Sequence, residues 1–389
     1  MTKEIYLDNS ATTPLSSAAR SAIEECLEEY GNPSSLHALG QRAEKRIKAA
    51  REAVLSGLGV RARDGELIFT SCGTEATALA FFGAAHAKER RTASRILISD
   101  SEHPSVKNTA MALVREGFEV VEIPTVGGVL DSAAIVAALD KPVFMASFML
   151  VNNETGALYD VADAFKRIRA RYPDAITHCD AVQGFMKIPF TPATLGADMI
   201  SVSGHKLHAP KGVGALYVCA DTVKRKRIVP YLYGGGQERG MRSGTENTVG
   251  IAAFGASVAD IKAREGEVRQ HLAELYTYAA ERLSALEGVI LNIPTGARVD
   301  HILNMTVPNI KSETVLHFLS ADGVYVSSGS ACSSHSGKPS SALMAFGLSA
   351  ERADQSLRVS FSEYNTKEDI DALVTSLSSA LARLVRVRR

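Results

Sequence analysis

The chain has 389 residues, 46% of them apolar, and its 43 basic residues balance its 43 acidic residues. This length allows a large buried core and favours two folded units. The balanced charge argues against broad binding to nucleic acid or anionic membranes, which requires an excess of basic residues. The sequence has no long apolar run and no basic-then-apolar N-terminal segment, so we expect a cytoplasmic protein with no membrane and no nucleic-acid partner.

Apolar strand patterns alternate with helical patterns from residue 5 to residue 218. The predicted strands are residues 5–7, 67–70, 95–99, 119–123, 143–151, 176–179, 198–202 and 213–218. The predicted helices are residues 16–29, 40–58, 73–87, 104–116, 131–139 and 160–171. Such alternation is typical of βαβ units, and it predicts an α/β fold with a mostly parallel sheet flanked by helices.

The pattern changes after residue 250. A long helical region, residues 251–287, precedes predicted strands at 302–307, 324–327 and 357–361 and predicted helices at 312–320 and 367–386. These elements indicate a smaller α+β unit. We place the boundary near residue 258, inside a helix, so that residues 16–258 form the large unit and residues 1–15 and 259–389 form the small one.

Polar clusters follow five of the predicted strands. They are residues 73–75 (GTE), 102–104 (EHP), 152–154 (NNE), 180–183 (DAVQ) and 203–206 (SGHK). Ligands of parallel α/β sheets bind where the carboxyl ends of the strands meet helix N-termini. We therefore expect the clusters to converge on one crevice.

These clusters contain groups that suit one particular cofactor. Gly73 and Thr74 open a helix and can offer backbone N–H groups to a phosphate. Lys206, between two buried strands, can lose its charge and form a Schiff base; Asp180 can pair with a ring nitrogen, and His103 can stack on the ring. Each also has an ordinary explanation, as a solvated lysine, a helix N-cap and a satisfied polar group. Together they describe a site for pyridoxal 5′-phosphate.

Five cysteines are present, with no CxxC spacing, which argues against a disulfide framework or a thiolate metal site. Cys332 differs from the others because it lies in residues 327–339, a stretch rich in glycine and serine that is typical of an exposed loop. An accessible thiol is a candidate nucleophile.

A longer set of motifs resembles the NifS/IscS-type cysteine desulfurases of the class V pyridoxal-phosphate-dependent aminotransferase family. The motifs run in the order of that family from residue 5 to about residue 360. They are residues 8–13 (DNSATT), 31–35 (GNPSS), 70–75 (TSCGTE), 102–103 (EH), 151–156 (VNNETG), 180–183 (DAVQ), 203–206 (SGHK), 210–212 (PKG), 234–245 with 247, and 328–332 (SGSAC).

The resemblance implies the architecture of the fold-type I enzymes, working as a homodimer with pyridoxal 5′-phosphate and no metal. Lys206, Cys332 and His103 would be catalytic. Asn153 and Arg358 would bind the substrate, with Arg358 holding its carboxylate. The cofactor-binding residues would be Gly73, Thr74, His103, Asn153, Asp180, Gln183, Ser203, His205, Lys206 and, from the other subunit, Thr245.

The implied reaction converts L-cysteine to L-alanine and leaves the sulfur on Cys332 as a persulfide. A sulfur-acceptor protein, either an iron–sulfur scaffold or a sulfur carrier for thio-cofactor or tRNA synthesis, would then receive it. The long stretch after Cys332 resembles the IscS-like group, whose cysteine lies on a long loop.

Some positions depart from the family pattern. Cys72 replaces a small residue, residues 76–78 (ATA) replace an asparagine-containing turn, and Ser362 with Glu363 replaces a glycine and an arginine, which inverts a charge near the expected carboxylate site. A selenocysteine lyase or another class V pyridoxal-phosphate enzyme therefore stays an alternative, although a transaminase needs no loop thiol. A non-catalytic partner-binding scaffold is a further alternative, which the intact Lys206 and Cys332 disfavour.

Overall fold

The computed structural model describes residues 4–87, 93–329 and 339–384. Its main feature is a seven-stranded sheet with the strand order β2-β8-β7-β6-β5-β3-β4. Strand β8 runs antiparallel to both of its neighbours, and the other pairs are parallel, which confirms the predicted mostly parallel sheet. The strands are β2 (Gly65–Thr70), β3 (Arg95–Ser99), β4 (Glu119–Ile123), β5 (Val143–Met149), β6 (Ile176–Asp180), β7 (Met199–Ser203) and β8 (Gly214–Cys219).

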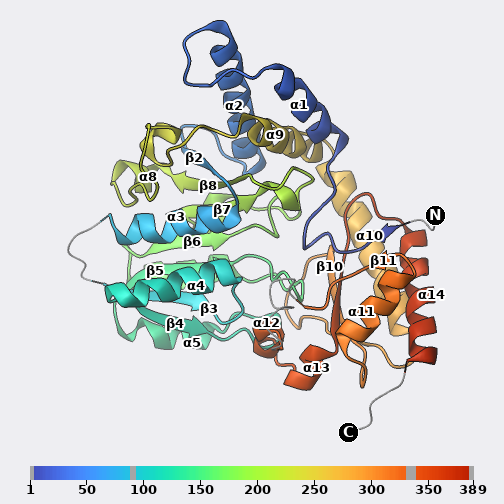
Figure 1. Ribbon diagram of the computed structural model, residues 1–389. Helices are drawn as coiled ribbons and strands as arrows, with labels where there is room; N and C mark the ends of the chain where they lie inside the picture. Colours follow the sequence, from blue (N-terminus) through green and yellow to red (C-terminus); the bar gives the residue numbers. More distant parts are fainter. Residues whose placement is uncertain (1–3, 88–92, 330–338, 385–389) are drawn as a thin grey trace.

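Helices cover both faces of this sheet, because its central strands bury side chains on both sides (Figure 1). Ile96 and Ile98 of β3 pack in the cluster that includes α3 (Gly73–Ala85) and α4 (Pro104–Leu113). Leu97, between them, packs in the cluster of the other face. That face is covered by α2 (Ala38–Gly57), α5 (Ser132–Ala137), α6 (Val161–Arg171) and α9 (Thr248–Ala263). Helix α1 (Ser17–Glu28) packs against α9.

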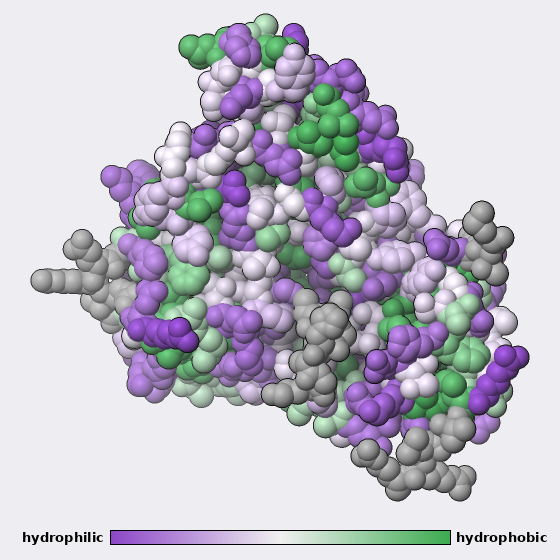
Figure 2. Space-filling model, in the orientation of Figure 1, coloured by the Kyte–Doolittle hydropathy of each residue, from purple (hydrophilic) through white to green (hydrophobic). Residues whose placement is uncertain are grey.

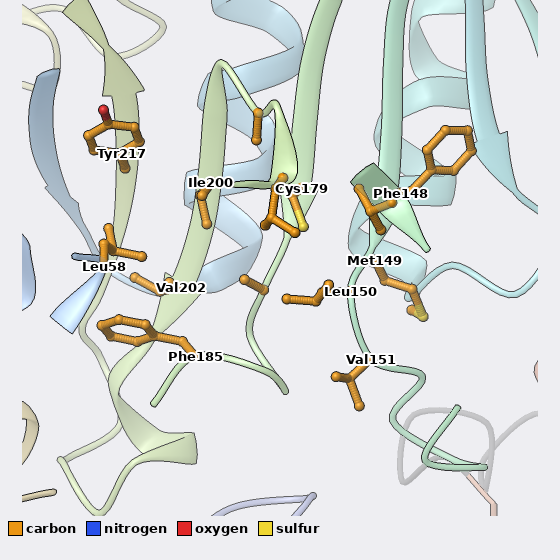
Figure 3. Packing of buried hydrophobic residues seen from close by; sticks show 14 of the residues in the cluster. Leu58, Phe148, Met149, Leu150, Val151, Cys179, Phe185, Ile200, Val202 and Tyr217 are labelled. Atoms are coloured by element: carbon orange, nitrogen blue, oxygen red, sulfur yellow. The ribbon is translucent and has the colours of Figure 1, made fainter. Parts of the chain in front are cut away.

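The face of the sheet that α2, α5, α6 and α9 cover forms the main hydrophobic core, beneath the carboxyl ends of the strands. Figure 3 shows Ile200 and Val202 of β7 near Leu58 and Phe185, with residues 148–151 along β5 and the segment that follows it. Phe148, Phe185 and Val202 are almost fully buried. Burial of such side chains contributes about 1.5–3 kcal/mol each, which anchors the strand ends that carry the polar clusters.

A second hydrophobic cluster lies in the smaller part of the molecule (Figure 1). It contains an antiparallel sheet of β9 (Ile290–Leu291), β10 (Ile302–Thr306) and β12 (Ser356–Ser360), and the parallel pair β1 (Ile5–Tyr6) and β11 (Val324–Tyr325). Helices α10 (Glu265–Ser284), α11 (Ser312–Ala321) and α14 (Lys367–Arg383) pack with them, and α12 (Ser341–Ala345) and α13 (Ala350–Asp354) lie between β11 and β12 in the chain. The division of the chain at residue 258 stays a prediction.

The region 251–287 is two helices, where the sequence pattern predicted one continuous helical region. The break is at Arg264, whose backbone angles are φ −119° and ψ 16°. Ile261 packs in the main core and Val268 packs in the second cluster. The change of packing partner within two turns explains the break, because one straight helix would present both residues to nearly the same side.

The described surface mixes hydrophilic and apolar residues. Figure 2 shows apolar patches on the projection that α1 and α2 form, where Leu27 and Leu36 are 63% and 91% exposed. Within residues 4–87, 93–329 and 339–384, no helix has the length and apolar character needed to cross a membrane.

Candidate active site

A cavity of about 260 Å³ lies at the carboxyl ends of β5, β6 and β7, beside the N-terminus of α3. The strands end together because they are paired in register: Met149 lies opposite Asp180, and Asp180 lies opposite Ser201. The five polar clusters therefore meet at one edge of the sheet. The predicted site residues that line the cavity are Gly73, Thr74, His103, Asn153, Asp180, Gln183, Ser203, His205, Lys206 and Arg358.

Lys206 ends a 3-10 turn, residues 204–206, that directly follows β7. Its Nζ donates hydrogen bonds to the carbonyl oxygens of Ser10 and Ala11, at 2.5 Å and 2.7 Å. The N-terminal segment also holds the turn itself, because Thr13 N donates to His205 O at 2.9 Å. A segment almost 200 residues away in the chain therefore holds the lysine at the carboxyl ends of the strands.

Asp180 is the last residue of β6 and is 7% exposed. Burial raises the pKa of its carboxyl group, while a 3.0 Å hydrogen bond from Val182 N to Oδ1 and the electrostatic influence of His103 and Lys206 oppose the rise. A cationic partner stabilises the ionised form of a carboxyl group in this environment. The arrangement suits a protonated ring nitrogen placed against Asp180.

His103 is the N-cap of α4, with Pro104 as the first helical residue. Its Nδ1 accepts a hydrogen bond from Ser105 N at 3.1 Å and lies 2.7 Å from Ser105 Oγ. The proton of the neutral ring is therefore on Nε2. Burial lowers the pKa of His103, and Lys206 lowers it further against the opposing charge of Asp180, so the ring is neutral at pH 7.

The N-terminus of α3 forms an end of the cavity that suits an anion. Its N-cap, Cys72, makes no side-chain capping bond, which leaves backbone N–H groups of the first turn for a ligand. A Cβ atom on Gly73 would lie 3.0 Å from Val182 Cγ2 and 3.4 Å from Ser203 Cβ, so glycine avoids a tight contact at this point. Thr74 follows it in the first turn.

Three further side chains leave polar atoms for a ligand. Ser203 Oγ and Gln183 Oε1 are buried and have no hydrogen-bond partner within the described part of the chain. Gln183 Nε2 donates to Ser10 O at 3.0 Å, which directs the amide. His205 Nδ1 lies 3.2 Å from Thr12 Oγ1, and burial together with Lys206 lowers the pKa of His205 to about 4. Unpaired buried polar atoms are costly, so they indicate a polar ligand.

Arg358 enters the cavity from the smaller part of the molecule, on β12. Its side chain is almost completely buried; Nη2 lies 2.6 Å from Asp8 Oδ1, and Nη1 donates to Asn153 O at 2.9 Å. Its backbone pairs with Ser327, because Arg358 N donates to Ser327 O at 2.7 Å. A buried guanidinium at the rim of a cavity is suited to a carboxylate ligand.

Two of the predicted residues are not placed in this cavity. Thr245 is exposed and is not part of the lining, so its role in the site of another subunit stays a prediction. Cys332 and most of its loop lie outside the described residues. Ser327, at the described start of this stretch, pairs with Arg358, which lines the cavity.

Glu363, expected to invert a charge near the carboxylate site, does not line the cavity. Its Oε2 lies 3.0 Å from His208 Nε2, on the far side of the Lys206 turn. Burial would raise the pKa of Glu363, but the hydrogen bond to His208 and the charges of His208 and Arg264 lower it overall. The Glu363 carboxylate therefore contacts His208 and not Arg358.

Sequence reasoning missed several contributors to the site. The carbonyl groups of Ser10 and Ala11 and the carboxylate of Asp8 belong to the motif at residues 8–13, which was noted without a role. Glu102, next to His103, is buried and accepts hydrogen bonds from Ser99 Oγ and Met149 N at 2.7 Å and 2.8 Å. Glu102 belongs to the polar cluster at residues 102–104 and to the family motif at residues 102–103, but neither assigned it a role.

Known proteins resemble this chain over nearly its whole length. The aminotransferase class-V family model matches residues 5–373. The cysteine desulfurase IscS of Dictyoglomus turgidum is 36% identical over 99% of this chain and 96% of the relative, and a cysteine desulfurase of Trichormus azollae is 37% identical over 98% and 93%. The solved structure of a NifS-like protein is 32% identical, with a TM-score of 0.89 over 98% of this chain and 100% of that one. The chain belongs to the class-V aminotransferase family and, within it, to the cysteine desulfurases.

Proposed function

We propose that the protein converts L-cysteine to L-alanine with pyridoxal 5′-phosphate and transfers the sulfur to its own Cys332 as a persulfide. The observation that carries this proposal is the meeting of Lys206, Asp180, His103 and Arg358 in one cavity. These residues come from three segments of the large sheet and from β12. A lysine, a buried carboxyl, a neutral imidazole and a buried guanidinium are the groups that this chemistry needs.

The cavity fits the cofactor. The open N-terminus of α3 with Thr74, the unpaired Ser203 Oγ and His205 would hold the phosphate. Asp180 would pair with the ring nitrogen, His103 would stack on the ring, and Gln183 with Asn153 would bind its phenolic oxygen. Pyridoxal phosphate, when bound, supplies an electron sink for the carbanion chemistry of amino acids.

The residues of the chain then have separate tasks. Arg358 binds the substrate carboxylate, in competition with Asp8, which holds the guanidinium at 2.6 Å. Lys206 takes the Cα proton of the substrate, and its neighbours Ser10 and Ala11 offer carbonyl groups that stabilise the resulting ammonium. His103 stays neutral beside it.

Cys332 is the proposed sulfur acceptor. Its thiolate forms a bond with the substrate sulfur while the carbon–sulfur bond breaks and leaves its electron pair on the substrate, so the products are alanine and a cysteine persulfide. Enzymes of this family are generally dimeric, and we propose that Thr245 of one subunit contributes to the phosphate site of the other. An iron–sulfur scaffold or a sulfur-carrier protein would take the persulfide sulfur.

The test is turnover of the cofactor-loaded protein with L-cysteine and a thiol reductant, with alanine and sulfide quantified. Equal amounts of both products are expected. Cys332→Ala should keep the visible absorbance of the bound cofactor and lose sulfide release, whereas the matched Cys219→Ala change, at the half-buried end of β8, should keep both. Sulfide release that persists in the Cys332→Ala variant would contradict the persulfide step.

Parallel reactions with L-selenocysteine and L-alanine separate the alternatives. A much higher turnover of selenocysteine would favour a selenocysteine lyase, and amino-group transfer from alanine to a keto acid would favour an aminotransferase. No turnover of any of the three by the loaded protein would favour a partner-binding scaffold. Lys206→Ala should abolish turnover and the absorbance band of the covalently linked cofactor together, because the lysine provides both the covalent attachment and the base.

A further inference from the structure

A second and much smaller cavity, of about 20 Å³, lies on the other side of the Lys206 turn. It is situated where the two hydrophobic clusters meet, because Ile261 of the main core and Val268 of the second cluster both line it. Lys206, Lys187, His208 and Glu363 also line it. The volume is enough for one water molecule.

Two buried polar atoms at this cavity lack hydrogen bonds. Lys187 Nζ and Glu363 Oε1 are inaccessible to solvent, and neither has a hydrogen-bond partner among the residues that the structure describes. Arg264 Nη2 is 3.7 Å from Glu363 Oε1, within ion-pair distance only. An ammonium donor and a carboxylate acceptor around a water-sized space are the partners that a buried water requires.

His208 joins Glu363 to the Lys206 turn. Its Nδ1 lies 2.9 Å from Pro14 O and its Nε2 lies 3.0 Å from Glu363 Oε2. Both partners are oxygen acceptors, so the His208 ring bridges the Pro14 carbonyl group and the Glu363 carboxylate. His208 also has a left-handed backbone, with φ 61°, a strained conformation that persists only when its surroundings hold it.

The backbone of this turn is fastened to the segment that receives the Lys206 ammonium. His208 N donates to Thr13 Oγ1 at 2.7 Å, and Ser16 N donates to His208 O at 3.0 Å. The same segment offers the carbonyl groups of Ser10 and Ala11 to Lys206 Nζ. A change at the His208 ring is therefore transmitted to the position of the lysine two residues before it.

The charged groups around this cluster come from several elements. Arg264, between α9 and α10, faces Glu363 and is paired with Asp260. Lys187 has a pKa lowered by burial to about 8, with Glu363 raising it and Arg358 lowering it, and the buried His301 is neutral, because burial and Lys187 hold its pKa well below the usual value. The Tyr364 and His208 rings are nearly perpendicular, at 78°, with centroids 4.8 Å apart.

We propose that Glu363 is a positioning residue for Lys206. Its carboxylate holds the His208 ring and, through a water in the small cavity, neutralises the buried ammonium of Lys187. Glu363 is part of the segment that follows β12, five residues after Arg358, so it ties the strand that binds the substrate carboxylate to the turn that carries the lysine. This inference rests on the proposed function of Lys206 as the residue that binds the cofactor covalently.

The experiment is a pH titration of the visible absorbance of the bound cofactor, which reports the protonation of its link to Lys206 and needs no L-cysteine. Glu363→Gln removes a negative charge near the lysine and should lower the titration midpoint by up to about one pH unit. Lys187→Met removes a positive charge from the same cavity and should raise the midpoint. The exposed Glu313→Gln, 80% accessible on α11, is the matched control and should leave it unchanged.

Opposite shifts from the two variants support the inference, because a general loss of structure would move both midpoints in the same direction. Equal midpoints for Glu363→Gln, Glu313→Gln and the unmodified protein would overturn it while leaving the proposed function intact. Lys187→Met keeps the test decisive if Glu363→Gln folds poorly, since it removes an unpaired buried charge, and an unchanged midpoint there also overturns the inference.

Kinetics and a crystal structure of the loaded protein complete the test. Glu363→Gln should lower kcat for L-cysteine about 5–20-fold and leave KM within about twofold, because Arg358 is untouched. An ordered water between Lys187 Nζ and Glu363 Oε1 is expected in the crystal. A dry cavity would contradict the water bridge, and a rise in KM at constant kcat would contradict positioning of the lysine. A protein that titrates as expected but releases no alanine from L-cysteine would refute only the proposed function.

Discussion

The cavity has two walls. The sheet wall is made from the ends of β5, β6 and β7, and the substrate wall is made from residues 8–13 and β12. The first wall is part of a continuous hydrogen-bonded sheet over the main core. The second is held by polar contacts between distant segments, such as Asn9 Nδ2 to Ser360 O at 3.0 Å and Ser10 N to Ser360 Oγ at 2.9 Å. The difference indicates that the attachment of residues 8–13 to β12 is the more adjustable part of the cavity, because individual hydrogen bonds contribute only about 0.5–1.5 kcal/mol each.

The largest effect is expected on the sheet wall, at Asp180. Asp180→Asn keeps an oxygen for the hydrogen bond from Val182 N but removes the charge, so kcat for sulfide release should fall about 10²–10³-fold. The thermal midpoint should stay constant or rise, because a buried carboxyl group is removed. Activity above a tenth of the original value would contradict the proposed pairing with the ring nitrogen.

A smaller effect is expected on the substrate wall, at Arg358. Arg358→Lys replaces a two-pronged donor with a single ammonium, so KM for L-cysteine should rise about 10–100-fold with a lesser change in kcat. The matched control is Arg352→Lys on α13, whose partner is Asn292 at 2.8 Å and which does not line the cavity. If kcat fell and KM stayed constant, Arg358 would not be the carboxylate ligand.

A change at Asp8 should lower KM a few-fold, opposite in sign to the rise expected for Arg358→Lys. Asp8→Asn removes the carboxylate that competes with the substrate for Arg358, so KM should fall about 2–5-fold. The unfolding free energy should decrease by about 1–3 kcal/mol, because a partly buried ion pair becomes a hydrogen bond from the charged guanidinium to a neutral amide. Steady-state kinetics and thermal unfolding of the same preparation measure both changes, and an increased KM would show that Asp8 orients Arg358 more than it competes for it.

The smallest effect on activity at neutral pH is expected at Glu102, behind the sheet wall. Burial raises the pKa of this carboxyl group to about 8, with Asp180 adding to the rise and hydrogen bonds from Ser99 and Met149 opposing it. The folded state therefore binds more protons than the unfolded state between about pH 4.5 and pH 8, and stability should fall as pH rises through this range.

Glu102→Gln should remove that decline, because glutamine does not titrate. Denaturant unfolding at pH 5, 6.5 and 8 measures the change, and activity at pH 7 should stay within about twofold, since the acid form of Glu102 is already neutral. A large loss of stability at pH 5 in this variant would show that the side chain is needed for its shape and not for its protonation state.

The sheet wall could be predicted from the sequence, whereas much of the substrate wall could not. Asp180 and His103 follow strands with a clear apolar pattern, so their meeting at one sheet edge needs only the rule for parallel strands. The partners of Arg358 and Glu363 have no local signal, because Asp8 is 350 residues from Arg358 and His208 is 155 residues from Glu363. The prediction placed Glu363 near the carboxylate site, but its contact with His208 directs it elsewhere.

The sequence by itself determined the alternation of strands and helices, the polar clusters at the strand ends and the family motifs. Apolar periodicity is a local property, and each strand or helix expresses it where it lies in the chain. The tertiary structure decided the break at Arg264, the seating of Lys206 on Ser10 and Ala11, and the joining of His208 to Glu363. These features depend on the packing of the two hydrophobic clusters against each other, which brings together residues that no local pattern relates.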